Sequence, residues 1–302
     1  MSEGLVYLDG RMIPARKATI SVLSPTVKYG INVFEGIRGY KAKRNGKLAL
    51  FRLGEHLSRL RRSMAMMGYG RSPSIEELES IVVSTVLANE PATDIHVRLS
   101  AYILGEGFID IDGPVALMCA TVPAQSKPPK NRIISAGVSS WRRIEDTSLP
   151  PRIKISANYA NSRLAMIEAR RHGYDEPILL TSNGKVAEAG AACIFVVRDG
   201  TLLTPGVTQG ILESVTRDSL IRLAREVCGL RVEEREIDRT ELLCADEAFL
   251  CGSAYEVTPI KSIDQITLTG GAPGPISQAV WAAYDKATRG ALKKYSRWLT
   301  PV

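Results

Sequence analysis

The stretch Pro150-Pro151-Arg152-Ile153-Lys154-Ile155-Ser156-Ala157-Asn158-Tyr159 places a lysine between two isoleucines, shortly before a helical pattern. If the segment is a strand, Ile153 and Ile155 point to one side and Lys154 to the other, because side chains alternate along a strand. The helix is expected over Asn161–His172, before Gly173. Most lysines are solvated surface charges, so the position alone does not separate a functional amine from the outer face of a strand.

An acid and two small-residue turns later in the chain supply groups that a phosphorylated cofactor needs. Glu188 lies on a later predicted strand, Lys185–Glu188. Ser214-Val215-Thr216 opens a predicted helix, and helix N-termini bind phosphate through their N–H groups and dipole. Gly252-Ser253-Ala254 follows a predicted strand, where backbone N–H groups also suit an anion. An amine, an acid and an anion cradle together suit pyridoxal phosphate (PLP).

The order of predicted elements indicates an α+β protein with much antiparallel pairing, because strands and helices do not alternate regularly. In the first part, strands are expected in a Leu5–Arg11 hairpin turning at Asp9-Gly10 and at Val33–Tyr40, Leu48–Phe51, Asp94–Leu104 and Pro114–Val122. Helices are expected at Glu55–Met67 and, behind a capping box at Ser74 and Glu77, up to Ala88.

A polar, proline-rich segment separates this part from the rest of the chain. The domains are therefore expected at residues 1–124 and 132–302, with residues 125–131 as the linker. In the second domain strands are expected at Arg132–Val138, Pro177–Thr181, Lys185–Glu188, Cys193–Arg198 and Glu247–Cys251, and further helices at Val215–Val227 and Pro275–Arg289.

The composition is that of an ordinary globular protein. The 302 residues include 45% apolar and 24% charged residues, and no apolar run reaches the roughly 18 residues of a membrane span. The five cysteines are odd in number and far apart, which favours free thiols over disulfides or a zinc site. With no basic-then-apolar leader at the start, a cytoplasmic location is expected. The net charge of +7 comes without a nucleic-acid motif, so a site for small anions is the more economical interpretation.

Several longer motifs make the chain resemble the class IV aminotransferases, which are fold-type-IV PLP enzymes, and among them the branched-chain amino acid aminotransferases. The resemblance runs from about Val6 to Ile276. It is carried by the segments Tyr29–Arg38 (YGINVFEGIR), Glu55–Leu60 (EHLSRL), Glu168–Tyr174 (EARRHGY), Glu188–Gly190 (EAG), Val215–Asp218 (VTRD) and Gly252–Pro259 (GSAYEVTP). It implies a smaller N-terminal α/β domain and a larger C-terminal pseudo-barrel domain that binds PLP.

The resemblance also implies a role for each matching residue. Lys154 would form the Schiff base with PLP and then move the Cα proton as base and acid. Glu188 would face the pyridine nitrogen, and Tyr159 would hydrogen-bond the phenolic oxygen, although a tyrosine there could also be a core residue. The phosphate would be held by Arg59, Val215, Thr216 and Ser253. His56 is interpreted as a structural histidine.

A transaminase accepts two substrates in one pocket, here a branched-chain L-amino acid and 2-oxoglutarate. The resemblance implies that the pocket is lined by Tyr29, Phe34, Arg38, Arg98, Trp141 and Ala254. Arg98 shares a strand face with His96 and could serve a substrate carboxylate, whereas Trp141 could instead be core. Because the family builds its site across a subunit interface, at least a homodimer is expected, with no nucleic-acid or membrane partner and no metal.

The sequence departs from the branched-chain pattern at three places, and the first two leave the substrate open. His96 stands where a tyrosine is usual, Gly105–Ile109 differs from the usual loop over the neighbouring subunit's pocket, and Ser214 replaces a common glycine. D-amino acid or (R)-amine transamination therefore stays possible, as does the lyase that releases 4-aminobenzoate from 4-amino-4-deoxychorismate. A basic PLP-binding or interaction protein without turnover is the non-enzymatic alternative.

Overall fold

The hairpin at Asp9-Gly10 is confirmed in the computed structural model, which describes residues 4–43 and 45–302. Asp9 and Gly10 have φ angles of 44° and 84°, the left-handed geometry that a two-residue hairpin turn requires. The turn joins β1 (Leu5–Leu8) and β2 (Arg11–Pro14), which pair in antiparallel fashion.

The contacts between residues divide the chain into two units that are not continuous in sequence. The first unit comprises Met1–Gln125, Ile153–Ala157 and Ala287–Val302, and the second comprises Ser126–Arg152 and Asn158–Lys286. The chain first passes from the first unit to the second between Gln125 and Ser126, within the linker expected at residues 125–131. The sequence predicted a single boundary between the domains. The structure differs, because Ile153–Ala157, which contains Lys154, and the C-terminal segment Ala287–Val302 both belong to the first unit.

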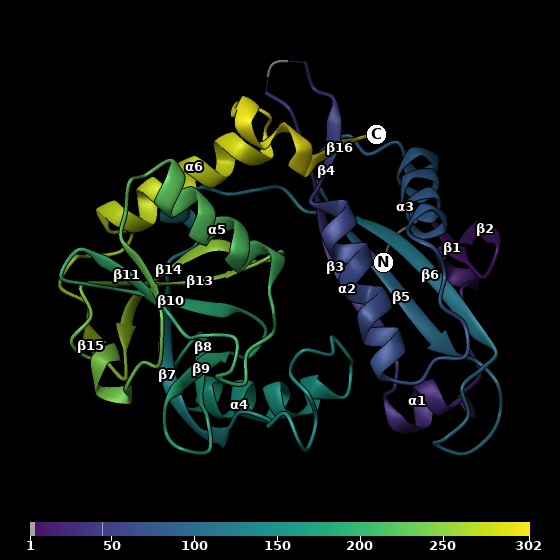
Figure 1. Cartoon of the computed structure of the whole chain (residues 1–302), viewed down its shortest axis with the longest axis horizontal. Helices are drawn as coiled ribbons and strands as arrows, with labels where there is room; N and C mark the ends of the chain where they lie inside the picture. Colours follow the sequence, from purple (N-terminus) through teal and green to yellow (C-terminus); the bar gives the residue numbers. More distant parts are fainter. Residues whose placement is uncertain (1–3, 44) are drawn as a thin grey trace. The chain divides into compact units, whose positions relative to one another are not determined.

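The strands of the first unit form one antiparallel sheet, in the order β16-β4-β3-β5-β6-β1-β2 (Figure 1). Its remaining strands are β3 (Val33–Lys41), β4 (Leu48–Phe51), β5 (Ile95–Ile103), β6 (Val115–Pro123) and β16 (Leu299–Pro301). Its helices are η1 (Ala15–Lys17), α1 (Pro25–Tyr29), α2 (Leu53–Met66), α3 (Ile75–Asn89) and η4 (Lys293–Trp298).

The core of the first unit lies between this sheet and the helices α2 and α3, which pack against β3, β6 and β1. Leu57, Leu60 and Met64 of α2 are fully buried, as their helical spacing predicts. The α3 helix begins after Ser74, whose hydroxyl accepts the Glu77 N–H at 3.1 Å. A side-chain oxygen at this position satisfies one of the unpaired N–H groups of the first turn.

The second unit contains a mixed sheet in the order β12-β11-β10-β13-β14-β7-β8-β9, with β15 beside β14. Its strands are β7 (Ile134–Arg142), β8 (Glu176–Leu180), β9 (Val186–Ala189), β10 (Cys193–Arg198), β11 (Thr201–Thr204), β12 (Val232–Glu234), β13 (Glu247–Gly252), β14 (Glu256–Ile263) and β15 (Ile266–Thr267). β7 pairs in parallel with both β14 and β8. The sheet curls, since β9, at one end of this strand order, contacts β10, which lies near the other end.

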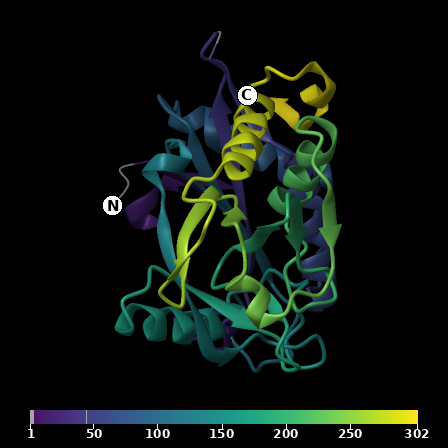
Figure 2. The same cartoon turned by 90° about the vertical axis from the view of Figure 1, so that its left-hand side faces the viewer.

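Helices lie on opposite sides of this curled sheet, as Figures 1 and 2 both show. They are η2 (Pro129–Asn131), α4 (Asn158–Arg171), α5 (Val215–Glu226), η3 (Arg239–Leu242) and α6 (Pro275–Thr288), the last two residues of which fall in the first unit. α4 packs on β7 and β8, and α5 packs on β13 and β12. The stacked rings of Phe195 and Phe249, 5.0 Å apart, are fully buried on neighbouring strands.

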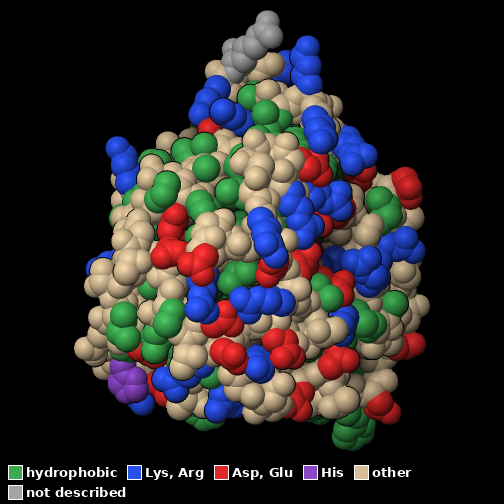
Figure 3. Space-filling view, turned by 60° about the vertical axis from the view of Figure 1, so that its left-hand side comes forward, with side chains coloured by type: hydrophobic (Ala, Val, Ile, Leu, Met, Phe, Trp, Pro, Cys, Tyr) green, Lys and Arg blue, Asp and Glu red, His purple; other side chains and the backbone are tan. Residues whose placement is uncertain are grey.

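The surface carries charges of both signs. On the face shown in Figure 3, Lys and Arg side chains are interspersed with Asp and Glu rather than gathered into one basic patch. All five cysteines lie in the described part of the chain and are free; Cys119, Cys193 and Cys251 are buried, whereas Cys244 is exposed. Within residues 4–43 and 45–302, no helix has both the length and the apolar character needed to cross a membrane.

Candidate active site

Lys154 is held in the first unit by its own backbone. Its N–H donates to the Ser63 hydroxyl at 3.2 Å, and its carbonyl accepts the Phe34 N–H at 3.0 Å. Ile153 and Ile155 are both buried in the core, as the predicted alternation requires. The expected strand itself is wrong: Ile155 makes an isolated bridge with Val33, and Lys154 lies outside the strands. Pro150 and Pro151 precede this segment and α4 begins at Asn158, so few residues remain to form further strand pairs.

The amine of Lys154 lies over an aromatic ring that it shares with an arginine. Its Nζ is 4.8 Å from the centroid of the Phe34 ring, and the Arg98 Cζ is 3.3 Å from the same centroid. Both cations are therefore attracted by the ring's π face. The structure thus brings together three of the predicted site residues, Phe34, Arg98 and Lys154.

Two further basic side chains lie on the same face of this sheet. Arg38 on β3 pairs across the strands with His96 on β5, and Gly36 pairs with Arg98. The His96 ring packs on Gly36, where an added Cβ would lie 2.8 Å from Cε1. Burial, followed by the charges of Arg38 and Arg98, lowers the pKa of His96 to about 4. A neutral imidazole between two guanidinium groups suits recognition of a carboxylate.

Arg59 lies on α2, on the other side of β3, and is 5% exposed. Its Nε and Nη2 both donate to the Glu35 carboxylate at 2.7 Å. Tyr29 ends α1 and is 39% exposed. It precedes Gly30, whose carbonyl accepts the Ala157 N–H at 3.1 Å, so the end of α1 is tied to the lysine segment.

In the second unit, Glu188 is a buried carboxylate on β9. It forms an ion pair with Arg143, with 2.6 Å between Oε1 and Nη2. Its other oxygen accepts the Leu212 N–H at 3.3 Å and lies 3.6 Å from the Cys193 sulfur. The carboxylate is therefore fixed in place by partners from three other segments.

The predicted phosphate helix α5 begins where it was expected. The Ser214 hydroxyl accepts the Arg217 N–H at 3.2 Å and caps the helix. Val215 and Thr216, in the first turn, are 8% and 3% exposed. Arg217 is also buried and bonds Thr204, the Pro205 carbonyl and Glu234, which makes it a structural residue of this unit.

The second small-residue turn lies between β13 and β14. Ser253 is half-buried and Ala254 is exposed. The carbonyl of the neighbouring Tyr255 accepts a hydrogen bond from the Arg132 guanidinium at 2.7 Å. Burial first, and then the nearby Glu176 and Tyr159, raise the pKa of Tyr255.

Tyr159 belongs to the first turn of α4, because that helix begins at Asn158 rather than at the expected Asn161. Trp141 lies near the end of β7 in the same unit. It is 44% exposed and lines a groove of about 360 Å³ with Leu164, Glu168 and His172.

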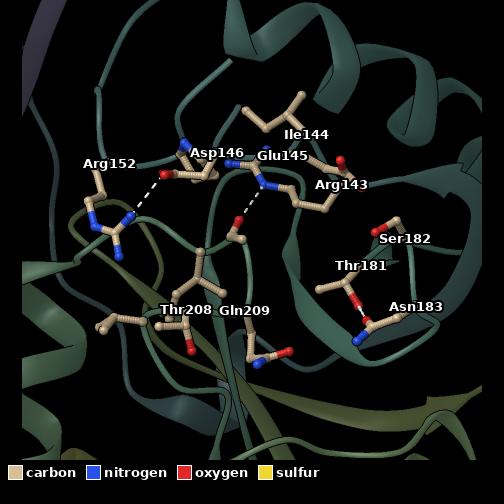
Figure 4. Close-up of a pocket in the computed structure, with 14 residues that line it drawn as sticks. Arg143, Ile144, Glu145, Asp146, Arg152, Thr181, Ser182, Asn183, Thr208 and Gln209 are labelled. Atoms are coloured by element: carbon tan, nitrogen blue, oxygen red, sulfur yellow. Dashed lines mark hydrogen bonds and ion pairs between the residues drawn. The ribbon is translucent and has the colours of Figure 1, made fainter. Parts of the chain in front are cut away.

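A pocket of about 260 Å³ is lined by Arg143, the ion-pair partner of Glu188, and by other residues of the second unit (Figure 4). Arg143 lines it and also donates from Nε to the Gly210 carbonyl at 3.1 Å. Arg152 lies across from it, bonded to Asp146 at 2.8 Å. Thr181 and Gln209 supply further polar walls.

The sequence reasoning missed Arg143 and Glu35, the partners of two predicted site residues. Glu35 could have been suspected, since strand alternation places it on the face opposite Phe34, beneath an amphipathic helix. His56, left out as a structural histidine, shares the Glu35 carboxylate with Arg59. Arg143 lies far from Glu188 in sequence, and no local pattern connects them.

Comparisons with known proteins agree with the expected family over nearly the whole chain. The model of the family described as amino-transferase class IV matches residues 32–263. A probable branched-chain-amino-acid aminotransferase from Aquifex aeolicus is 37% identical, covering 100% of this chain and 97% of that protein.

Two solved structures are also similar along their whole length. The branched-chain aminotransferase of Thermoproteus uzoniensis with norvaline has a TM-score of 0.93 and 40% identity, covering 99% of both chains. The branched-chain amino acid aminotransferase of Thermobaculum terrenum in its PLP form has a TM-score of 0.93 and 41% identity, again over 99% of each. The expected α+β fold of the class IV aminotransferases is confirmed, and this chain belongs to that family.

Proposed function

We propose that this chain catalyses PLP-dependent transfer of the amino group from leucine, isoleucine and valine to 2-oxoglutarate. The observation that carries the proposal is likeness along the full length to proteins named branched-chain aminotransferases, at 37% identity in sequence and 40–41% among solved structures.

The groups in each unit fit PLP chemically. The first unit offers an amine at Lys154 and a buried arginine at Arg59. The second offers a buried carboxylate at Glu188 and the N-terminus of α5, a helix of 12 residues. When bound, PLP supplies an electron sink that stabilises a carbanion at the substrate Cα.

The chain's own residues then take distinct roles. Lys154 would remove the substrate Cα proton as general base and then give a proton back as general acid. Glu188 would keep the pyridine nitrogen protonated through its negative charge, and Tyr159 would donate a hydrogen bond to the phenolic oxygen. Arg59, Val215, Thr216 and Ser253 would hold the phosphate through charge and N–H donors.

The substrate pocket is assigned to Tyr29, Phe34, Arg38, Arg98, Trp141 and Ala254. Phe34 and the other aromatic side chains give apolar contact to an aliphatic side chain. Arg98 lies against Phe34 beside Lys154, which suits the second carboxylate of 2-oxoglutarate.

The test is a visible absorbance spectrum of the purified protein, recorded before and after addition of L-leucine, followed by an assay of 2-oxoglutarate conversion to glutamate. We expect a PLP band that bleaches with L-leucine, and turnover with leucine, isoleucine and valine. No band after reconstitution with PLP would overturn the proposal and favour a basic interaction protein.

A second candidate function is transamination of D-amino acids or (R)-amines, which His96 favours. It replaces the usual tyrosine and lies between Arg38 and Arg98, so the carboxylate-binding groups differ from the branched-chain pattern. A band that responds to an (R)-amine or D-alanine but not to L-leucine would select this function. Release of pyruvate from 4-amino-4-deoxychorismate would select the lyase.

We also propose that the enzyme is at least a homodimer in the cytoplasm. The loop 105–109 supports the first point, because Phe108 and Ile109 are 79% and 65% exposed, an apolar surface typical of contact sites. The free thiols support a reducing compartment. Light scattering after gel filtration should give a dimer or larger; a fully active monomer would contradict the assembly.

A further inference from the structure

Glu35, His56 and Arg59 form a buried ion-pair network in the first unit, with side chains only 0%, 2% and 5% exposed. The Arg59 Nε donates to Oε1 of Glu35, and its Nη2 donates to Oε2. The His56 Nδ1 lies 2.7 Å from the same Oε2. One carboxylate therefore holds two basic side chains of α2, His56 and Arg59.

The charges in this network follow from its burial. Burial alone would raise the pKa of Glu35, but Arg59 and His56 outweigh it and hold that pKa far below its usual range. Burial also lowers the pKa of His56, against the opposing pull of Glu35. At neutral pH the network is thus a carboxylate, a guanidinium and a neutral imidazole that donates its Nδ1 proton.

The same face of α2 also holds the lysine segment. His56, Arg59 and Ser63 are spaced three and four residues apart, so they lie on one side of the helix. Ser63 accepts the backbone N–H of Lys154 at 3.2 Å. Helix α2 therefore fixes Arg59 and the Lys154 backbone relative to each other, within a single unit.

We propose that Glu35 is a positioning residue: its two-bond clamp orients the Arg59 guanidinium for the cofactor phosphate, and His56 steadies the clamp. The inference rests on the proposed function, in which Arg59 binds that phosphate. Two parallel bonds fix the plane of a guanidinium and hence the directions of its remaining N–H groups. A buried ion pair contributes little net stability compared with apolar residues of similar size, so orientation is the better explanation for it.

The test compares apo-protein binding of PLP and of pyridoxal, which lacks the phosphate. The dissociation constant of pyridoxal divided by that of PLP, both measured on one preparation, reports the phosphate contribution alone. Glu35→Gln keeps the shape but loses the charge. We expect its PLP affinity to fall roughly 10–100-fold, as when outer partners of metal ligands are removed, with pyridoxal affinity unchanged.

Glu247→Gln is the matched control. Glu247 is a buried carboxylate, 3% exposed, whose oxygens accept the N–H groups of Ile276 and Ser277 at the start of α6. Its substitution disturbs a buried carboxylate without touching Arg59. It should lower stability and leave the ratio for PLP and pyridoxal unchanged.

A double-mutant cycle separates this inference from the proposed function and guards against misfolding. Arg59→Met should lower the ratio, and adding Glu35→Gln to it should lower the ratio no further, because Glu35 acts only through Arg59. The double variant also removes both buried charges together, which favours folding. An unchanged ratio in Arg59→Met would refute the phosphate role of Arg59. A lowered ratio in Arg59→Met with an unchanged ratio in Glu35→Gln, or equal losses for PLP and pyridoxal in Glu35→Gln, would overturn the positioning role alone.

Discussion

Arg143 and Glu188 form a buried ion pair, with 2.6 Å between guanidinium and carboxylate and only 6% of each side chain exposed. Arg143 comes from the segment after β7 and Glu188 from β9, so the pair ties together two parts of the second unit. Removing one partner of such a pair leaves an uncompensated buried charge, which is strongly destabilising.

We therefore expect Arg143→Met to lower the free energy of unfolding by about 3–5 kcal/mol. Urea unfolding of the apo-protein measures this. Arg152→Met is the control, since Arg152 lines the same pocket (Figure 4) but is 37% exposed with exposed partners. A surface pair contributes about 0–1 kcal/mol. Equal losses in the two variants would contradict the importance of the Glu188 pair.

Lys154→Ala should lower the turnover rate by at least about 10²–10⁴-fold, because the general base that moves the Cα proton is lost. Stopped-flow measurement of the half-reaction with L-leucine reports that step directly. Lys185→Ala serves as the control; Lys185 bonds Asp238 at 2.7 Å on the surface of the second unit. A Lys154→Ala enzyme with nearly the wild-type rate would mean that another lysine carries the chemistry.

The low pKa of His96 should make stability depend on pH. Burial, with Arg38 and Arg98, lowers that pKa from 6.5 to about 4. Between these values the unfolded chain binds a proton that the folded chain does not, so the free energy of unfolding falls as pH falls. At about 1.4 kcal/mol per pKa unit, the loss reaches up to about 3 kcal/mol by pH 4.

Thermal unfolding of His96→Asn across that range should show a shallower loss than the wild type. His172→Asn is the control, because His172 is exposed at the end of α4. If the wild type and His96→Asn lose stability in parallel, His96 is not the group that titrates.

The caps of α3 and α5 offer a second matched pair. Ser74 and Ser214 each accept an N–H from the first turn of their helix. Ser74→Ala and Ser214→Ala should each cost about 1 kcal/mol of stability. Only Ser214→Ala should also weaken PLP binding, measured by titration of the apo-protein, since α5 is the proposed phosphate helix. Equal PLP affinity in both variants would argue against that role for α5.

Local patterns predicted most of the elements, and the exceptions have physical causes. β10 (Cys193–Arg198) was predicted residue for residue, because turn signals bound a continuous apolar run. No strand was predicted at β14 (Glu256–Ile263), which contains Pro259 and begins with Glu256 at a φ of 52°. Tertiary pairing with β13 and β7 makes it a strand all the same.

The site was predictable where residues match motifs and not where they pair at long range. Lys154, Glu188 and the start of α5 follow from short segments. The bonds from Glu35 to Arg59 and from Arg143 to Glu188 join residues on different elements, which no local periodicity reveals. The position of Lys154 outside the strands likewise depends on Val33 and Ser63, far back in the chain.

The discontinuity of the two units constrains how genes for such proteins can recombine. A single exchange at residues 125/126 between two relatives would not swap whole units, because Ile153–Ala157 and Ala287–Val302 would travel with the wrong half. The chimera would carry the Lys154 segment of one parent against the Ser63 and Val33 of the other, and β16 of one parent beside β4 of the other. Substitutions in Ile153–Ala157 or β16 must therefore stay compatible with the residues that these segments contact in the N-terminal part of the chain.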